Sequence, residues 1–80
     1  MYSTHVCSYC RLAEALLVRK GAQVERLLVD DDPVLHQQMV QRTGRKTVPQ
    51  IYIGGRHIGG YRELVALDHT GELDDLLAQP

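Results

Sequence analysis

Cys7 and Cys10 are the two cysteines of the chain, and two residues separate them. A disulfide between them would close a loop too short to stabilise a fold by restricting the unfolded chain. The longest apolar runs, such as Ala15-Leu16-Leu17-Val18, are four residues long, so we expect neither a signal peptide nor a membrane span. We therefore expect a cytoplasmic, reducing environment, where such pairs are catalytic, redox-sensing or metal-binding.

The cysteine pair precedes an amphipathic segment. Apolar residues recur with helical spacing from Leu12 to Leu17, which predicts a helix over Arg11–Lys20 that ends at Gly21. A thiol at the first turn of a helix meets unpaired N–H groups and the positive end of the helix dipole. In such motifs the pKa of the first cysteine falls from about 8.5 to about 3.5–7.5. We therefore expect Cys7 to attack a disulfide and Cys10 to resolve the product.

Two other interpretations of the cysteine pair stay open at this point. The thiols could be incidental, or they could form half of a zinc site. A zinc site would need two further ligands from the histidines of the chain, which are His5, His36, His57 and His69. No two of these histidines have the spacing of a ligand pair, so redox chemistry is favoured.

Length and charge restrict the remaining function classes. Eighty residues allow one small domain, which we assign to 1–80. The 9 basic and 10 acidic residues give a net charge of −1, which offers little attraction to a phosphate backbone. We therefore expect neither a nucleic acid nor a membrane as partner.

The elements that must position the cysteines follow from apolar spacing and from glycine, proline and aspartate signals. Asp32 is predicted to cap a second helix that has Pro33 in its first turn and stops at Gly44, and Gly54-Gly55 is the pair required by a two-residue hairpin turn. The predicted strands are 2–4, 24–29, 50–53 and 56–58, and further helices follow Gly59-Gly60 and Gly71.

The predicted order is β-α-β-α-β-β-α, with the short closing helix after Gly71. Because a helix joins the first two strands, they should lie parallel, while the hairpin adds an antiparallel pair. This predicts an α/β fold with a mixed four-stranded sheet and helices on both faces.

Four motifs along the whole chain resemble the glutaredoxin family. They are Cys7-Ser8-Tyr9-Cys10, the segment Thr43 to Gln50 that contains Thr47-Val48-Pro49, the hairpin from Ile51 to Ile58, and Gly59-Gly60-Tyr61 at the start of a helix. The resemblance implies a thioredoxin-like fold, glutathione as electron donor, and reduction of protein–glutathione mixed disulfides and protein disulfides.

The resemblance also implies a cis bond between Val48 and Pro49. A cis turn would aim the backbone of Val48 at the sulfur, where an extended peptide could pair with it. The helix start after Gly59 would hold the γ-glutamyl carboxylate, Glu63 would face the γ-glutamyl ammonium, and Lys46, then Arg42, would meet the glycyl carboxylate. The residues implied to bind glutathione are Tyr9, Arg42, Lys46, Thr47, Val48, Pro49, Gly60, Tyr61, Arg62 and Glu63.

Two departures from the family pattern bear on function. Thr4 stands where a lysine is common, and Ser8 replaces a proline. With Ser8 in place of proline, the cysteine motif resembles that of cluster-binding members of the family. Two chains could then form a dimer in which each presents Cys7 and one glutathione to a bridging [2Fe-2S] cluster. Otherwise a monomer is expected. A third alternative is a protein that receives electrons from thioredoxin reductase and serves ribonucleotide reductase.

Overall fold

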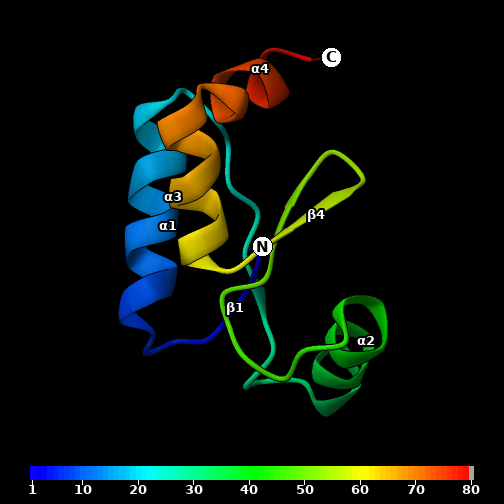
Figure 1. Ribbon diagram of the computed structural model, residues 1–80. Helices are drawn as coiled ribbons and strands as arrows, with labels where there is room; N and C mark the ends of the chain where they lie inside the picture. The colour runs from blue at the N-terminus through cyan, green and yellow to red at the C-terminus, as the bar shows by residue number, and fades with distance from the viewer. Residues whose placement is uncertain (80) are drawn as a thin grey trace.

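The computed structural model describes residues 1–79. Its first seven elements follow the predicted order β-α-β-α-β-β-α, and the predicted short closing helix is a separate eighth element (Figure 1). The elements are β1 Tyr2–Ser3, α1 Ser8–Arg19, β2 Leu27–Leu28, α2 Pro33–Thr43, β3 Ile51–Ile53, β4 Arg56–Gly59, α3 Tyr61–Thr70 and α4 Glu72–Ala78.

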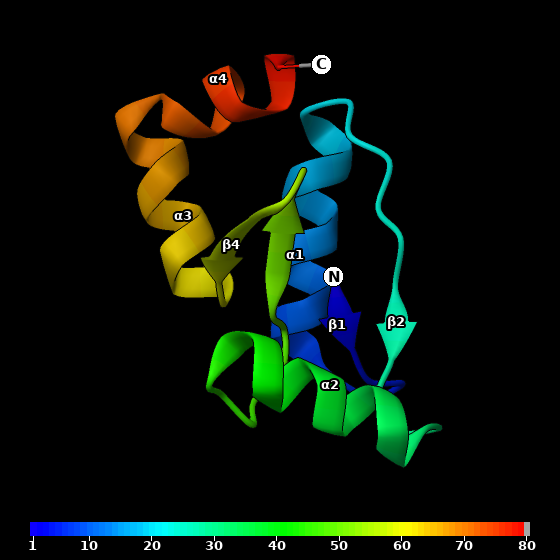
Figure 2. The same cartoon turned by 90° about the vertical axis from the view of Figure 1, so that its right-hand side faces the viewer.

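The strands lie side by side in the order β2, β1, β3, β4 (Figure 2). β1 and β2 are parallel, and β3 and β4 form the antiparallel hairpin. One bridge joins the two pairs: Tyr2 N–H donates to the Gln50 carbonyl over 2.9 Å, and Gln50 N–H donates to the Tyr2 carbonyl over 3.2 Å. The predicted strand directions are therefore confirmed.

Three strands are shorter than predicted, whereas β4 extends one residue further, to Gly59. The segment expected as a strand over 24–29 forms ladder pairs at Leu27 and Leu28 only, because β1 offers just Tyr2 and Ser3 as partners. Val24 instead packs its side chain on the apolar core without a strand partner. The sheet is thus two short ladders joined by one bridge rather than a continuous four-stranded ladder.

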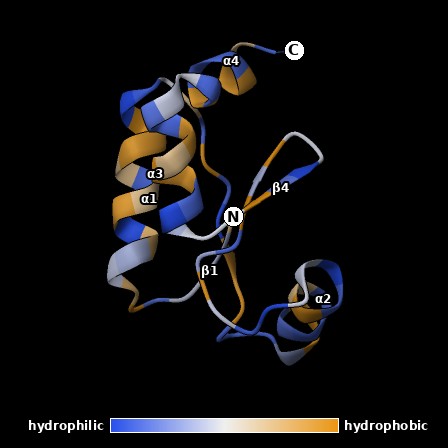
Figure 3. Cartoon of the chain, in the orientation of Figure 1, coloured by the Kyte–Doolittle hydropathy of each residue, from blue (hydrophilic) through white to orange (hydrophobic). Residues whose placement is uncertain are grey.

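Helices cover both faces of the strands. α1 and α3 pack together on one face and α2 lies on the other (Figures 1 and 2). The first face buries a cluster of six residues, Ala13, Leu16, Leu17, Ile51, Leu64 and Leu73, and the second buries Tyr2, Val29 and Met39. Apolar and polar residues are interspersed along α1 and α3 (Figure 3), and the buried residues of α1 recur every three to four positions, as an amphipathic helix requires.

The ends of α2 match the predicted signals, whereas α1 begins at Ser8 rather than at the predicted Arg11 because Cys7 is its N-cap. Asp32 Oδ1 accepts from the N–H groups of Val34 and Leu35 over 3.0 and 3.3 Å, so it caps α2 with Pro33 in the first turn. α2 ends at Gly44 in the left-handed conformation. Two-residue turn geometry is also confirmed at Gly54-Gly55, although only Gly54 takes a positive φ, of 62°.

Lys20 ties the end of α1 to the C-terminal helices. Its Nζ lies 2.9 Å from carboxylate oxygens of both Asp68 and Asp74. In the part of the chain that the structure describes, no helix has the length and apolar character needed to cross a bilayer.

Candidate active site

The cysteine pair lies where β1 leads into α1. Cys7 is the N-cap of α1, and the Cys10 N–H donates to Cys7 Sγ over 3.1 Å. The two sulfurs are joined as a disulfide, with Cα atoms 5.2 Å apart. Cys10 is buried at 4 % exposure, whereas Cys7 is half-buried. Cys7 is therefore the sulfur that an incoming thiol or disulfide can reach.

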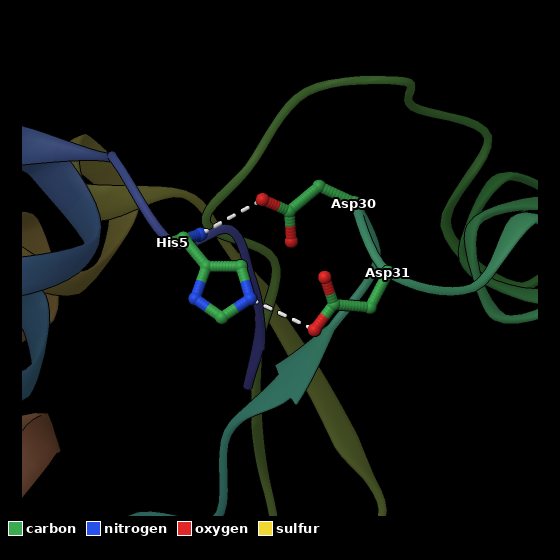
Figure 4. A group of neighbouring side chains, drawn as sticks. All are labelled: His5, Asp30 and Asp31. Carbon is green, nitrogen blue, oxygen red and sulfur yellow. Dashed lines mark hydrogen bonds and ion pairs between the residues drawn. The ribbon is translucent and has the colours of Figure 1, made fainter.

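The loop before Cys7 is fastened to the loop after β2 through His5. The His5 backbone N–H donates to Asp30 Oδ2 over 3.1 Å, and its Nε2 lies 2.8 Å from Asp31 Oδ2 (Figure 4). Asp31, then Asp30, raise the pKa of His5 above its ordinary value. All three side chains are exposed, so we interpret the contact as a surface ion pair that holds the loop.

The Val48–Pro49 bond is cis, as the resemblance implied. Pro49 is buried, and its carbonyl oxygen would lie 3.6 Å from a Cβ on Gly60, so the proline loop and the start of α3 are in close contact. Between them lies a pocket of about 250 Å³. Its lining residues are Tyr9, Arg45, Thr47, Val48, Pro49, Gln50, Gly60, Tyr61, Arg62 and Glu63.

The charged wall of this pocket is held by Glu63 in the first turn of α3. Glu63 Oε1 accepts from the Gly60 N–H over 3.0 Å and from Arg45 Nη1. The hydrogen bond from Arg45, followed by that from Gly60, lowers the pKa of Glu63. The next N–H groups of the helix, at Tyr61 and Arg62, have no acceptor within the first turn and can meet an anion.

The structure gathers most of the residues predicted to bind glutathione. Those that line the pocket are Tyr9, Thr47, Val48, Pro49, Gly60, Tyr61, Arg62 and Glu63. Tyr9 is 62 % exposed, and its ring lies 5.9 Å from the ring of Tyr61, so two aromatic rings form one side of the pocket.

Two predicted cations lie elsewhere. Arg42 donates to the Tyr2 hydroxyl over 2.8 Å, and its guanidinium lies 4.3 Å from the centre of the Tyr52 ring, on the α2 face of the strands. Lys46 is exposed and is not part of the pocket lining. The cations that line the pocket are instead Arg45 and Arg62. Arg42 points away because α2 turns its side chain toward the two tyrosines.

Sequence reasoning missed Arg45 and Gln50 as pocket residues. Arg45 fits a cationic rim before Thr47 and a solvated helix end equally well from the sequence, and nothing in the spacing distinguishes it from Lys46. Gln50 did carry a signal, because it is a polar residue at the start of an apolar strand and is 1 % exposed. Buried polar side chains of this kind are held by hydrogen bonds.

The cysteines face a second, smaller depression away from the pocket. It measures about 30 Å³ and is lined by Ser3, Thr4, His5, Cys7, Cys10, Arg11, Glu14 and Arg26. Arg26 Nε lies 3.3 Å from Glu14 Oε2 at this site. Charged residues therefore lie next to the disulfide on the side of this depression, and Tyr9 adjoins it on the other side.

Comparisons with known proteins agree on one family. The family model described as Glutaredoxin matches residues 1–58. Glutaredoxin 3 of Escherichia coli strain K12 is 46% identical over 77 residues, which cover 96% of this chain and 93% of that protein. The solution structure of a glutaredoxin from Brucella melitensis is also 46% identical, with a TM-score of 0.84 over 95% of this chain and 83% of that chain.

A crystal structure of a buckwheat glutaredoxin–glutathione complex is 30% identical, with a TM-score of 0.88 over 95% of this chain and 72% of that chain. The family model thus includes both cysteines and the cis-proline loop, and the whole-chain matches extend over α3.

Proposed function

The chain belongs to the glutaredoxin family of thiol–disulfide oxidoreductases, and from this premise we propose that it reduces protein–glutathione mixed disulfides and protein disulfides with glutathione as electron donor. The observation that carries the proposal is the pocket between the cis-proline loop and the start of α3, whose wall includes Tyr9 from the cysteine motif. The buckwheat relative, which has the same fold, was solved in complex with glutathione.

In the proposed reaction the reduced Cys7 thiolate attacks the glutathione sulfur of a mixed disulfide. The protein thiolate leaves and takes up a proton, and glutathione becomes bonded to Cys7. A second glutathione thiolate then attacks the bound glutathionyl sulfur, which releases oxidised glutathione and restores the Cys7 thiolate. The N-cap position supports the thiolate at both stages, because unpaired helix N–H groups surround it.

Reduction of a protein disulfide would also use Cys10. Cys7 attacks one sulfur of the substrate disulfide and forms a mixed disulfide with it, while the other substrate sulfur leaves as a thiolate, and Cys10 then attacks Cys7 Sγ. The second substrate thiolate leaves, and the Cys7–Cys10 disulfide of the structure results. Two glutathiones then reduce that disulfide and become one oxidised glutathione.

We assign the glutathione contacts by charge. The extended peptide would lie along Val48, with its γ-glutamyl carboxylate at the N–H groups of Tyr61 and Arg62. Arg45 and Arg62 both line the pocket, and because Arg62 lies at the helix start assigned to the γ-glutamyl carboxylate, we assign Arg45 to the glycyl carboxylate in place of Lys46. A reducing compartment, the cytoplasm, fits a catalytic thiol that must return to the thiolate form.

Replacement of Cys7 and of Cys10 tests the proposal. A coupled assay with glutathione, its reductase and a small mixed disulfide should show no turnover with Cys7→Ser. Cys10→Ser should retain turnover of the mixed disulfide and lose most of its reduction of protein disulfides. Turnover by Cys7→Ser, or reduction of the oxidised protein by thioredoxin reductase and NADPH but not by glutathione, contradicts the proposal.

A bridging [2Fe-2S] cluster is the second candidate, and one observation favours it. Cys10 is buried and Cys7 is accessible, so each chain can offer one thiolate outward. Two chains and two glutathiones would then supply the four thiolates that such a cluster takes. Anaerobic purification with glutathione should yield a coloured dimer if this candidate is right, and a colourless monomer if it is wrong.

A further inference from the structure

We propose that His57 is a positioning residue for the pocket, acting through the side chain of Gln50 on Thr47. The inference rests on the proposed function for its effect on glutathione. His57 Nε2 lies 2.8 Å from Gln50 Oε1, and Gln50 Nε2 donates to the Thr47 carbonyl over 3.0 Å. Thr47 begins the cis-proline segment that lines the pocket, whereas His57 is on β4, outside the pocket lining.

Only one orientation of the Gln50 amide satisfies these contacts. If the amide were turned over, its oxygen would face the Thr47 carbonyl oxygen, and two acceptors would be opposed. The amide nitrogen must therefore face Thr47, where it also lies 3.4 Å from Thr47 Oγ1. The amide oxygen then faces His57, so Nε2 of His57 must carry the hydrogen.

Loss of the hydrogen bond between His57 and Gln50 costs free energy because Gln50 is 1 % exposed and water cannot replace the donor. Without the His57 donor, the Gln50 oxygen would stay buried and unpaired, which favours rotation of the amide away from Thr47. Both the neutral Nε2–H form and the imidazolium can donate this hydrogen bond. His57 can therefore donate to Gln50 in either charge state.

The hairpin places His57 for this contact. The two-residue turn sets the register that places His57 opposite Tyr52, and the irregularity of β3 lies beyond this pair, between Ile51 and Tyr52. The ring of Tyr52 lies 5.1 Å from the His57 ring and limits its rotation. The His57 side chain thus makes two separable contributions, ring packing on Tyr52 and hydrogen-bond donation to Gln50.

Two substitutions separate these contributions. His57→Phe keeps a ring against Tyr52 and removes the donor, whereas His57→Gln removes the ring and can still donate an N–H to Gln50. The matched control is His69→Phe, since His69 is exposed on α3. Gln50→Glu is a second variant: it keeps the acceptor for His57 but has no N–H for Thr47.

In the glutathione-coupled assay, His57→Phe and Gln50→Glu should raise the glutathione concentration for half-maximal rate by about 3- to 10-fold, as expected for a lost hydrogen bond. In His57→Phe, the maximal rate and the alkylation rate of Cys7 should not change, because His57 lies outside the pocket lining. His57→Gln should restore most of the wild-type value, and His69→Phe should match the wild type. A defect confined to the maximal rate, or a His57→Gln variant as impaired as His57→Phe, overturns the proposal.

An independent readout keeps the positioning inference testable if the protein does not use glutathione. By NMR, the two side-chain amide protons of Gln50 should give separate, slowly exchanging signals in the wild type and in His57→Gln. They should exchange fast in His57→Phe. Slow exchange in His57→Phe would overturn the relay, whereas a wild type without glutathione turnover would overturn the proposed function alone.

Discussion

Arg45 Nη1 donates to Glu63 Oε1, and this pair joins the segment after α2 to the first turn of α3 at the wall of the pocket. The side chains are 47% and 38% exposed, so the pair is an exposed one that contributes little to folding. A zwitterionic peptide in the pocket can take over both partners, because its carboxylate can meet Arg45 and its ammonium can meet Glu63. The pair therefore places a positive and a negative charge in the pocket wall, where each can bind the opposite charge of the proposed ligand.

The first prediction compares Arg45 with its neighbour Lys46. Arg45→Gln should weaken glutathione binding by about 2- to 5-fold, in line with one partly exposed charge contact. Lys46→Gln is the matched control, because it removes the same charge from a residue outside the pocket lining. Calorimetric titration of a Cys7→Ser, Cys10→Ser background measures both. A larger loss in Lys46→Gln than in Arg45→Gln would restore the assignment made from sequence.

The same pair predicts a dependence on pH. Because Arg45 and the Gly60 N–H lower the pKa of Glu63, their contribution to stability is present above the ordinary glutamate pKa, near 4.3, and is lost as the pH falls through the lowered value. Arg45→Gln should raise the Glu63 pKa toward its ordinary range. Carboxyl-detected NMR titration measures it, and an unchanged Glu63 titration would contradict the pairing.

The second prediction concerns selective reactivity. In the reduced protein at neutral pH, iodoacetamide should label Cys7 and leave Cys10 unmodified, because Cys7 is the N-cap and Cys10 is 4 % exposed. Peptide mass spectrometry locates the label. The Cys7→Ser variant should remain unlabelled under the same conditions, and rapid labelling of Cys10 in the wild type would reverse the assigned roles.

The third prediction concerns the loop before Cys7. Asp31 raises the pKa of His5, so the ion pair contributes below the ordinary histidine pKa and is lost as the pH rises through the raised value. Asp31→Asn should lower the His5 pKa, measured by NMR of the ring protons. Asp30→Asn should lower it less, because Asp30 accepts from the His5 backbone N–H. Equal shifts in the two variants would contradict the contact between His5 and Asp31.

The sequence allowed the helices to be predicted better than the strands. Helix ends depend on local signals, such as Asp32 before Pro33 and the glycine at 44, and these capping interactions involve neighbouring residues. Strand length depends on a partner far away in the chain. Val24 is β-branched and apolar, yet it has no ladder partner, because β1 is parallel to β2 and begins at Tyr2, opposite Leu27.

The candidate site was predictable where a backbone motif defines it and less so where a side-chain direction does. The cysteine pair, the cis-proline and the start of α3 follow from short motifs. The sequence shows Arg42, Arg45 and Lys46 as neighbouring cations, but the direction of Arg42 on α2 and the path of the chain after Gly44 decide which of them lines the pocket. Gln50 and His57 could have been flagged together, as polar residues in an apolar hairpin that require partners.

The fourth prediction tests the packing of α3, which carries the pocket wall. Leu64 is 0 % exposed in the main core, so Leu64→Ala should lower the free energy of unfolding by about 2–5 kcal/mol. Leu12→Ala makes the same change on α1 at a residue that is 48 % exposed, and we expect a loss below about 1 kcal/mol. Urea denaturation compares the two, and similar losses would contradict the burial of Leu64.

The last prediction concerns the backbone at Gly59, directly before α3. Gly59 has a φ of +116°, and a Cβ there would lie 2.5 Å from Glu63 Oε1. Gly59→Ala should therefore strain the backbone by about 1–3 kcal/mol and displace the Glu63 carboxylate from the Gly60 N–H. Gly55→Ala is the control, since a Cβ at Gly55 meets nothing within 4 Å and its φ is not positive.

Two measurements separate these effects of Gly59→Ala. Urea denaturation should show a loss of stability for Gly59→Ala that Gly55→Ala does not share. NMR titration should show the Glu63 pKa of Gly59→Ala raised, because both the Gly60 and the Arg45 contacts depend on the present position of the carboxylate. A destabilised variant with an unchanged Glu63 titration would mean that the side chain adjusts without leaving Arg45, and that the pocket wall tolerates a shift at this turn.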